Sequence, residues 1–141
     1  MQDFVHLHVH TQYSLLDGQA SVARLVDKAM QNGMKGIAVT DHGNMFGIKE
    51  FTNYVNKKNS GPKGEVKDLK KRIAGIEAGT IECEDKEAEI AACKAKIVEA
   101  ENKLFKPIIG CEMYVARRTM DLKEGKPDQS GYHLIVLAKN E

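Results

Sequence analysis

The order of apolar patterns in the N-terminal part of the chain constrains its fold more than any other feature. Residues 4–10 alternate between apolar side chains and histidines, which predicts a strand. Residues 22–30, preceded by the capping residue Ser21, and residues 48–55 carry apolar stripes at helical spacing. Between them, residues 36–40 form a short apolar run typical of a buried strand. The order strand, helix, strand, helix indicates an α/β domain with a parallel sheet or a barrel.

A highly charged segment, residues 63–103, interrupts this pattern. Its 41 residues include nine Lys or Arg and ten Asp or Glu, and no Pro, His or aromatic residue. Nine apolar residues in this segment and directly after it, called the seam below, recur at spacings of three and four in two runs: Val66, Leu69, Ile73 and Ile76, then Ile90, Cys93, Ile97, Ala100 and Leu104. The spacing predicts an inserted antiparallel helical hairpin of coiled-coil type, entered at Gly61-Pro62 and left near Pro107. It would be a solvated helical arm or a surface that docks a partner.

The remaining sequence returns to strand patterns. Residues 108–115 and 132–138 read as strands, and the polar residues 117–130 read as a loop. We therefore expect an incomplete barrel domain formed by residues 1–62 and 104–141. Because the sequence stops directly after a core-type strand, we also expect a fragment of a longer protein.

Composition excludes several classes of protein. The net charge is +1, which argues against a strongly basic nucleic-acid module. No apolar run is long enough to span a bilayer, and the N-terminus has no signal-peptide pattern. Cys83, Cys93 and Cys111 form no CxxC pair, so neither a disulfide framework nor a zinc ribbon is predicted. A cytoplasmic protein is expected.

The strongest chemical signal is the run His6-Leu7-His8-Val9-His10. On a strand, its three imidazoles share one face with neighbours about 7 Å apart. Imidazoles at that spacing can bind one metal ion or a tight metal cluster. The alternative is a half-buried strand whose polar face is rich in His. Three of the chain's five histidines lie in this run, which favours the metal site.

Other candidate ligands follow or lie within predicted strands. His42 comes directly after the apolar run 36–40, where the carboxyl end of a strand would expose it. Its neighbour Asp41 could be a structural hydrogen-bonding residue or a ligand. His133 begins a strand, and Asp17 lies in the loop after the first strand.

Glu112 interrupts an otherwise apolar strand, so its carboxylate needs a partner. A metal ion would satisfy it, and so would Arg117 or Arg118. Cys111 alternates to the opposite face and is expected in the core. A mixed His and carboxylate set from several strand ends suits Zn²⁺, Mn²⁺ or Fe²⁺, with Mg²⁺ as an alternative. Two or three such ions would activate water and hold a phosphoryl oxygen, so phosphoester hydrolysis is the predicted reaction class.

Four segments in order, FVHLHVHTQYSLLDG, TDHGNMFG, KPIIGCEMYVA and YHLIVLAKN, resemble the N-terminal PHP (polymerase and histidinol phosphatase) domains of bacterial DNA polymerase III α subunits. The resemblance covers residues 3–56 and 105–141. It implies part of a distorted (β/α)7 barrel. It also implies a metal site with the ligands His8, His10, Asp17, His42, Glu112 and His133. The residues that act in catalysis would be His8, His10, His42 and Glu112. His6 would lie beside these ligands without binding a metal ion itself.

The resemblance also implies a role for the parent protein. It would be a DNA-directed DNA polymerase whose PHP site removes nucleotides from the 3′ end of a DNA primer. Its partners would be the proofreading exonuclease subunit and other replisome subunits, and no membrane partner is implied. The alternatives are a free-standing PHP phosphoesterase acting on a small phosphate monoester and a non-catalytic scaffold that docks replisome partners.

Overall fold

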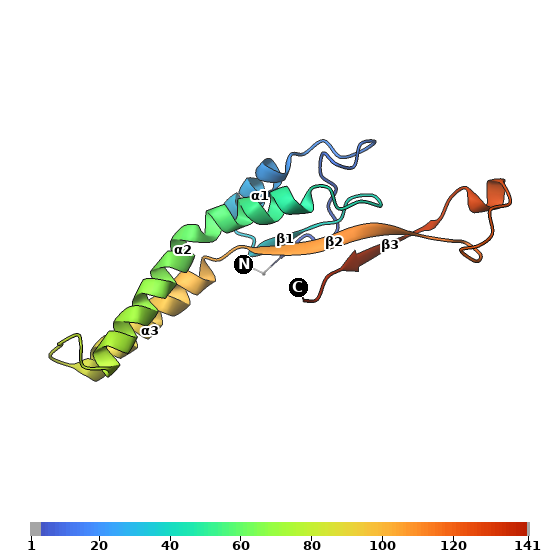
Figure 1. Ribbon diagram of the computed structural model, residues 1–141. Helices are drawn as coiled ribbons and strands as arrows, with labels where there is room; N and C mark the ends of the chain where they lie inside the picture. The colour runs from blue at the N-terminus through green and yellow to red at the C-terminus, as the bar shows by residue number, and fades with distance from the viewer. Residues whose placement is uncertain (1–3, 141) are drawn as a thin grey trace. The chain divides into compact units, whose positions relative to one another are not determined.

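The computed structural model describes residues 4–140, which divide into two compact units: residues 4–55 with 106–140, and residues 56–105. Its elements in chain order are α1 (Val22–Gln31), β1 (Gly36–Val39), α2 (Ile48–Glu77), α3 (Lys86–Asn102), β2 (Lys106–Val115), the 3₁₀ turn η1 (Lys126–Asp128) and β3 (Tyr132–Leu137) (Figure 1). The expected mixture of helices and strands is confirmed.

The first unit is built on a mixed three-stranded sheet with the order β1-β2-β3. β1 and β2 are parallel, with Val39 opposite Ile109, whereas β2 and β3 are antiparallel, with Tyr114 opposite His133. The expected parallel pairing is present between β1 and β2, whereas β3 adds an antiparallel strand. A parallel return requires a crossover of a dozen or more residues, usually a helix. Only the three-residue η1 lies in the connection between β2 and β3.

Residues 4–10 run beside β1 but do not form the predicted regular strand. The Ala38 amide donates to the His6 carbonyl at 2.8 Å, and the Thr40 amide donates to the Val9 carbonyl at 2.8 Å. The span of three residues from His6 to Val9 therefore lies opposite a span of only two residues, from Ala38 to Thr40. One extra residue, at a bend on Leu7, breaks the ladder in the manner of a bulge.

Helix α1 follows its sequence signals closely. The Ser21 hydroxyl accepts a hydrogen bond from the Arg24 amide, which caps the first turn. After the helix, Gly33 adopts a positive φ of 76°, the conformation that glycine tolerates without strain. The core of the first unit is formed by the buried side chains of Val22, Val26, Ala29, Ile37, Ala38, Val39, Phe51, Val55 and Cys111.

Gly61 and Pro62, where the insertion was expected to begin, lie inside α2, which continues to Glu77. An interior proline removes one helix hydrogen bond and its ring crowds the carbonyl four residues earlier, but its φ is close to the helical value, so the helix can continue through it. Within the second unit, every seam residue is buried or half-buried. Arg72 forms an ion pair with Glu89 at 2.7 Å, which links α2 to α3 beside the seam.

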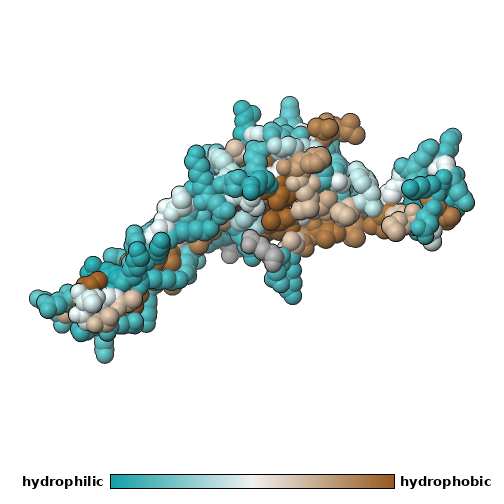
Figure 2. Space-filling model, in the orientation of Figure 1, coloured by the Kyte–Doolittle hydropathy of each residue, from teal (hydrophilic) through white to brown (hydrophobic). Residues whose placement is uncertain are grey.

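Hydrophobic side chains remain exposed on the sheet. Figure 2 shows them gathered along β2 and β3, while hydrophilic residues cover most of the visible face of α2 and α3. Met113, Leu134 and Val136 are each close to half exposed. Between residues 4 and 140, the structure contains no helix that combines the length and apolar character needed to cross a membrane.

Candidate metal centre

The candidate site forms where β1 ends beside the middle of β2. Past Val39, the parallel pairing continues as an isolated bridge between His42 and Glu112. The Gly43 amide donates to the Glu112 carbonyl at 2.9 Å, and the Glu112 amide donates to the Asp41 carbonyl at 3.0 Å. Backbone pairing therefore fixes His42 and Glu112, the two candidate ligands in these segments, opposite one another.

The Glu112 carboxylate lies at the centre of four imidazoles. Its Oε2 atom is 2.7 Å from Nε2 of His8 and 2.7 Å from Nε2 of His10. Its Oε1 atom pairs with Nδ1 of His133 and lies 3.4 Å from Nδ1 of His42. Only 3% of the Glu112 side chain is exposed, so these histidines, rather than water, surround the charge.

A second carboxylate closes the other side of the site. Oδ2 of Asp17 lies 3.0 Å from Nδ1 of His10 and 2.9 Å from Nε2 of His42. About half of the Asp17 side chain is exposed. The site therefore has a buried carboxylate on one side and a solvent-accessible one on the other. We refer to His8, His10, Asp17, His42, Glu112 and His133 together as the His–carboxylate cluster.

The cluster has the donor set of a metal site. Three overlapping groups of three residues each place one ligand atom per residue within 4.8 Å of the others: His8, His10 and Glu112; His10, Asp17 and His42; and His42, Glu112 and His133. Nδ1 of His42 is buried and has no hydrogen-bond partner within the described residues. Burying an unpaired polar atom is unfavourable, and a metal ion would satisfy this nitrogen. Imidazole and carboxylate donors fit Zn²⁺, Mn²⁺ or Fe²⁺.

Hydrogen bonds keep the carboxylates of the cluster ionised. Burial raises the pKa of Glu112, but hydrogen bonds from His8 and His10 outweigh burial and lower it below its ordinary value. The hydrogen bond from His42 is the largest influence on Asp17, whose pKa is also lowered. Burial lowers the pKa of His10, yet its bonds to Glu112 and Asp17 raise it overall. Ionised carboxylates are the form that binds metals, whereas protons on His10 would compete with a metal ion.

The structure resolves the alternatives left open for Glu112. Arg118 pairs with Asp128 at 2.5 Å and with Glu124 at 3.1 Å, and Arg117 lies over the Tyr132 ring at 5.5 Å. Within the described residues, neither arginine provides the partner that Glu112 needs. The histidines provide it instead.

Three other candidates lie outside the cluster. The His6 ring packs against Phe4, with a distance of 4.7 Å between ring centroids, and belongs to none of the three groups. Asp41 is buried and accepts hydrogen bonds from Thr11, so it has the structural alternative of its two predicted roles. Cys111 is buried, as expected for a core residue.

Sequence reasoning missed the residues that hold the cluster in place. Thr11 and Ser14 are buried polar residues beside the ligand-bearing segments, and both donate hydrogen bonds to Asp41. The Tyr114 ring is stacked on the His42 ring at 6.3 Å and meets the His133 ring edge-on at 5.0 Å. Tyr114 alternates onto the same strand face as Glu112, and this spacing could have identified it.

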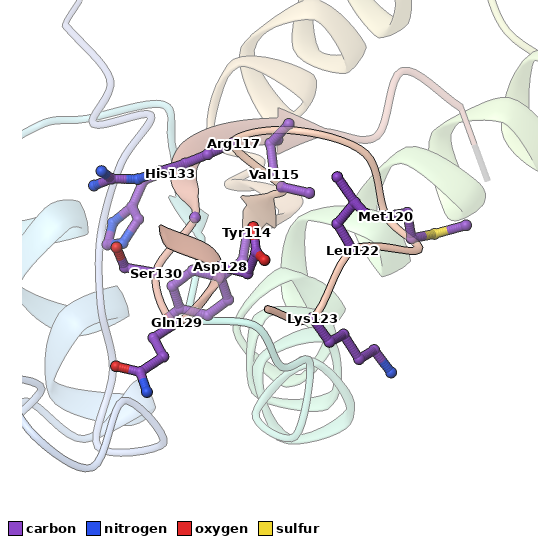
Figure 3. Close-up of a pocket in the computed structure, with 12 residues that line it drawn as sticks. Tyr114, Val115, Arg117, Met120, Leu122, Lys123, Asp128, Gln129, Ser130 and His133 are labelled. Carbon is purple, nitrogen blue, oxygen red and sulfur yellow. The ribbon is translucent and has the colours of Figure 1, made fainter. Parts of the chain in front are cut away.

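Two cavities adjoin the cluster. One of about 530 Å³ opens beside Asp17, His42 and His133. The other, of about 590 Å³, lies inside the connection between β2 and β3, where Tyr114 and His133 form the wall nearest the cluster (Figure 3). A ligand of moderate size can therefore approach the histidines from solvent.

Comparison with known proteins finds one matching family model and several similar proteins. The family model described as "PHP domain" matches residues 6–97. The chain is 38% identical over 139 residues to "DNA polymerase III subunit alpha" of Treponema pallidum and 38% identical over 141 residues to the protein of the same name from Borreliella burgdorferi. Each alignment covers 98% of this chain and 8% of the relative. The chain thus spans about one-twelfth of the length of these relatives.

Proposed function

This chain belongs to the PHP domain family, and on that premise we propose that its His–carboxylate cluster binds two or three divalent metal ions and hydrolyses phosphodiester bonds. One observation carries the proposal: a buried carboxylate, Glu112, lies among four imidazoles, and one of these has a buried nitrogen that finds no hydrogen-bond partner among residues 4–140. A donor set that holds two or three ions suits hydrolysis of phosphoesters, because the ions activate water and stabilise the attacking and leaving oxygens.

Each side chain has a defined task in this proposal. Glu112 would be shared between metal positions, since it belongs to two of the three donor groups. His8 and His10 would complete one position, and His42 with His133 would complete another. Asp17, the exposed carboxylate, would hold the side of the site that faces the cavity of about 530 Å³.

The bound ions would supply an activated water molecule and neutralise the charge that develops on a phosphoryl oxygen. The residues of the chain would do the rest. His8, His10, His42 and Glu112 would hold the reacting centre in place, with Glu112 buried beneath the more exposed imidazoles. The cavity beside Asp17 would leave room for the substrate to approach in line with the bond that breaks.

The relatives support a larger context for this site. We propose that the chain is the N-terminal PHP region of a bacterial DNA polymerase III α subunit, acting in the cytoplasm. Its substrate would be the 3′ end of a DNA primer, and its partners would include the proofreading exonuclease subunit and other replisome subunits. Residues 1–62 and 104–141 would form part of a distorted (β/α)7 barrel, and residues 63–103 would form an inserted antiparallel hairpin of coiled-coil type.

Elemental analysis of the purified chain tests the metal centre directly. We expect Zn, Mn or Fe at one or more equivalents per chain, and we expect the His8→Ala/His10→Ala double variant to lose it. His6→Ala is the matched control, because His6 lies on the same segment but outside the donor groups. Equal metal content in all three proteins would reject the centre.

Release of mononucleotides from a 3′-labelled single-stranded DNA tests the reaction. The metal-loaded chain should release them, and chelation should stop the release. Cleavage of p-nitrophenyl phosphate without cleavage of DNA would favour a phosphomonoesterase. A metal-loaded chain that cleaves neither substrate would reject the hydrolytic function.

A further inference from the structure

We infer that Asp41 and Ser14 form a positioning device for the Asp17 side of the cluster, so that metal binding there depends on their hydrogen bonds. The inference rests on the proposed metal centre and adds to it the residues that set its geometry. Neither residue belongs to the donor groups found within the described chain. Their contacts nevertheless reach the segments that carry His10, Asp17, His42 and Glu112.

The buried carboxylate of Asp41 organises the loop after His10. Its Oδ1 atom accepts hydrogen bonds from the Thr11 amide at 2.6 Å and from the Ser14 hydroxyl at 2.7 Å. Its Oδ2 atom accepts one from the Thr11 hydroxyl at 2.8 Å. Asp41, Thr11 and Ser14 are each at most 2% exposed. Charge-assisted bonds of this kind hold their partners more firmly than neutral ones do.

Ser14 also forms hydrogen bonds with the backbone of two candidate ligands, His42 and Asp17. Its hydroxyl accepts a hydrogen bond from the His42 amide at 3.2 Å, while its carbonyl accepts bonds from the Asp17 amide at 3.2 Å and the Gly18 amide at 2.7 Å. A Cβ atom at Gly18 would lie 1.8 Å from the Thr11 carbonyl oxygen, so the turn closes tightly. Ser14 thereby ties the Asp17 loop to the segment that carries His42.

The backbone of Asp41 reaches the remaining side of the site, since its carbonyl accepts the Glu112 amide at 3.0 Å. The hydrogen bonds of the Asp41 side chain, in contrast, go to Thr11 and Ser14, which lie in the loop between His10 and Asp17. Loss of the Ser14 hydroxyl should therefore disturb the group His10, Asp17 and His42 and spare the group His8, His10 and Glu112. This selectivity distinguishes a positioning role from a general contribution to stability.

The test is metal titration of the metal-free chain with Co²⁺, followed by its visible absorption, together with urea unfolding of the metal-free chain. Ser14→Ala should weaken one metal equivalent about 10- to 100-fold, the usual effect of losing a residue that orients a ligand, while another equivalent binds as in the wild type. Asp17→Ala should give the same pattern. Asp41→Asn keeps the oxygen that accepts from the Thr11 amide and the Ser14 hydroxyl, although not the one that accepts from the Thr11 hydroxyl, and should restore most of the affinity that Asp41→Ala loses.

Ser60→Ala is the matched control, because the exposed Ser60 hydroxyl bonds only to a carbonyl of its own helix, at 2.7 Å. Asn44→Ala provides a second approach if Ser14→Ala does not fold, since the Asn44 amide donates to the carbonyls of Tyr13 and His42 and ties the same loop to the same ligand. Wild-type titrations for both Ser14→Ala and Asn44→Ala, or loss of every equivalent together, would overturn the inference. A wild-type chain that binds no metal would instead reject the proposed centre.

Discussion

Replacing Glu112 with Gln is the most informative single change in the cluster, because it keeps the shape of the side chain and removes its charge. In the metal-free chain, the carboxylate accepts two hydrogen bonds of 2.7 Å, from His8 and His10. A hydrogen bond to a charged acceptor contributes about 1 kcal/mol more than a neutral one. We therefore expect Glu112→Gln to lower the free energy of unfolding of the first unit by about 2 kcal/mol at pH 7.

The chain offers a clean probe for this measurement. It has no Trp, and its four tyrosines all lie in the first unit, so tyrosine fluorescence reports the unfolding of that unit alone. In urea with a chelator present, a loss of about 2 kcal/mol should move the midpoint by about 1 M. Glu124→Gln is the matched control, since this exposed carboxylate pairs with Arg118 and should contribute less than about 1 kcal/mol.

The metal-loaded state gives the second part of the prediction. Because Glu112 belongs to two of the three donor groups, Glu112→Gln should lower the metal content as well as the stability. An unchanged midpoint together with an unchanged metal content would refute the central place that we assign to this carboxylate.

Three further predictions follow from single contacts. The pKa of His10 is raised, so the contribution of its charged form to the stability of the metal-free chain is complete below pH 6.5. This contribution is lost as the pH rises through the raised pKa. The urea midpoint should therefore fall with rising pH, and His10→Gln should flatten the decline. Gly18→Ala should disrupt the turn before α1 and lower metal content. Gly64→Ala, whose new Cβ would meet no atom within 4 Å inside α2, should stabilise the helix by about 0.5–1 kcal/mol in thermal unfolding followed by circular dichroism. Ile76→Ala should lower the free energy of unfolding of the second unit by about 2–5 kcal/mol, because the side chain is fully buried. Val98→Ala, at an exposed position, should change it by less than about 0.5 kcal/mol. Equal loss of helical circular dichroism on heating both variants would contradict the assignment of Ile76 to a packed seam.

Local signals predicted local structure well. The capping hydroxyl of Ser21 and the glycine at position 33 mark the ends of α1, because both act through contacts within one turn of the helix. The apolar run 36–40 predicts β1 for a similar reason, since a strand buried on both faces needs apolar side chains at every position. The ligand candidates His8, His10, His42, Glu112 and His133 were likewise visible as polar residues at strand ends or within apolar strands.

Long-range pairing could not be predicted in the same way. Alternation in residues 4–10 gives the side-chain period but not the extra residue that breaks its ladder with β1. The apolar pattern of β3 does not encode its direction, which depends on the length and structure of the connection from β2. Pro62 lowers helix propensity without forbidding a helix, so the packing of the surrounding residues decides.

The hydrogen-bonded loop between His10 and Asp17 was missed for a different reason. Ser and Thr in a loop usually face solvent or cap a helix, and sequence alone does not reveal that a buried carboxylate lies opposite them. Asp41 was recognisable as a structural or ligating residue, but its partners Thr11 and Ser14 became apparent only from their distances to it.

The wide spacing of the cluster along the chain also affects how the protein is made. Glu112 lies 104 positions after His8, so a ribosome that adds ~5–20 residues per second reaches it roughly 5–20 s later. During that interval, the imidazoles of the nascent chain lack their buried acceptor, while residues 56–105 have time to form helices from neighbouring residues alone. Completion of the proposed centre around Glu112 is therefore a late event in biosynthesis, because it requires the strand that carries this carboxylate to leave the exit tunnel.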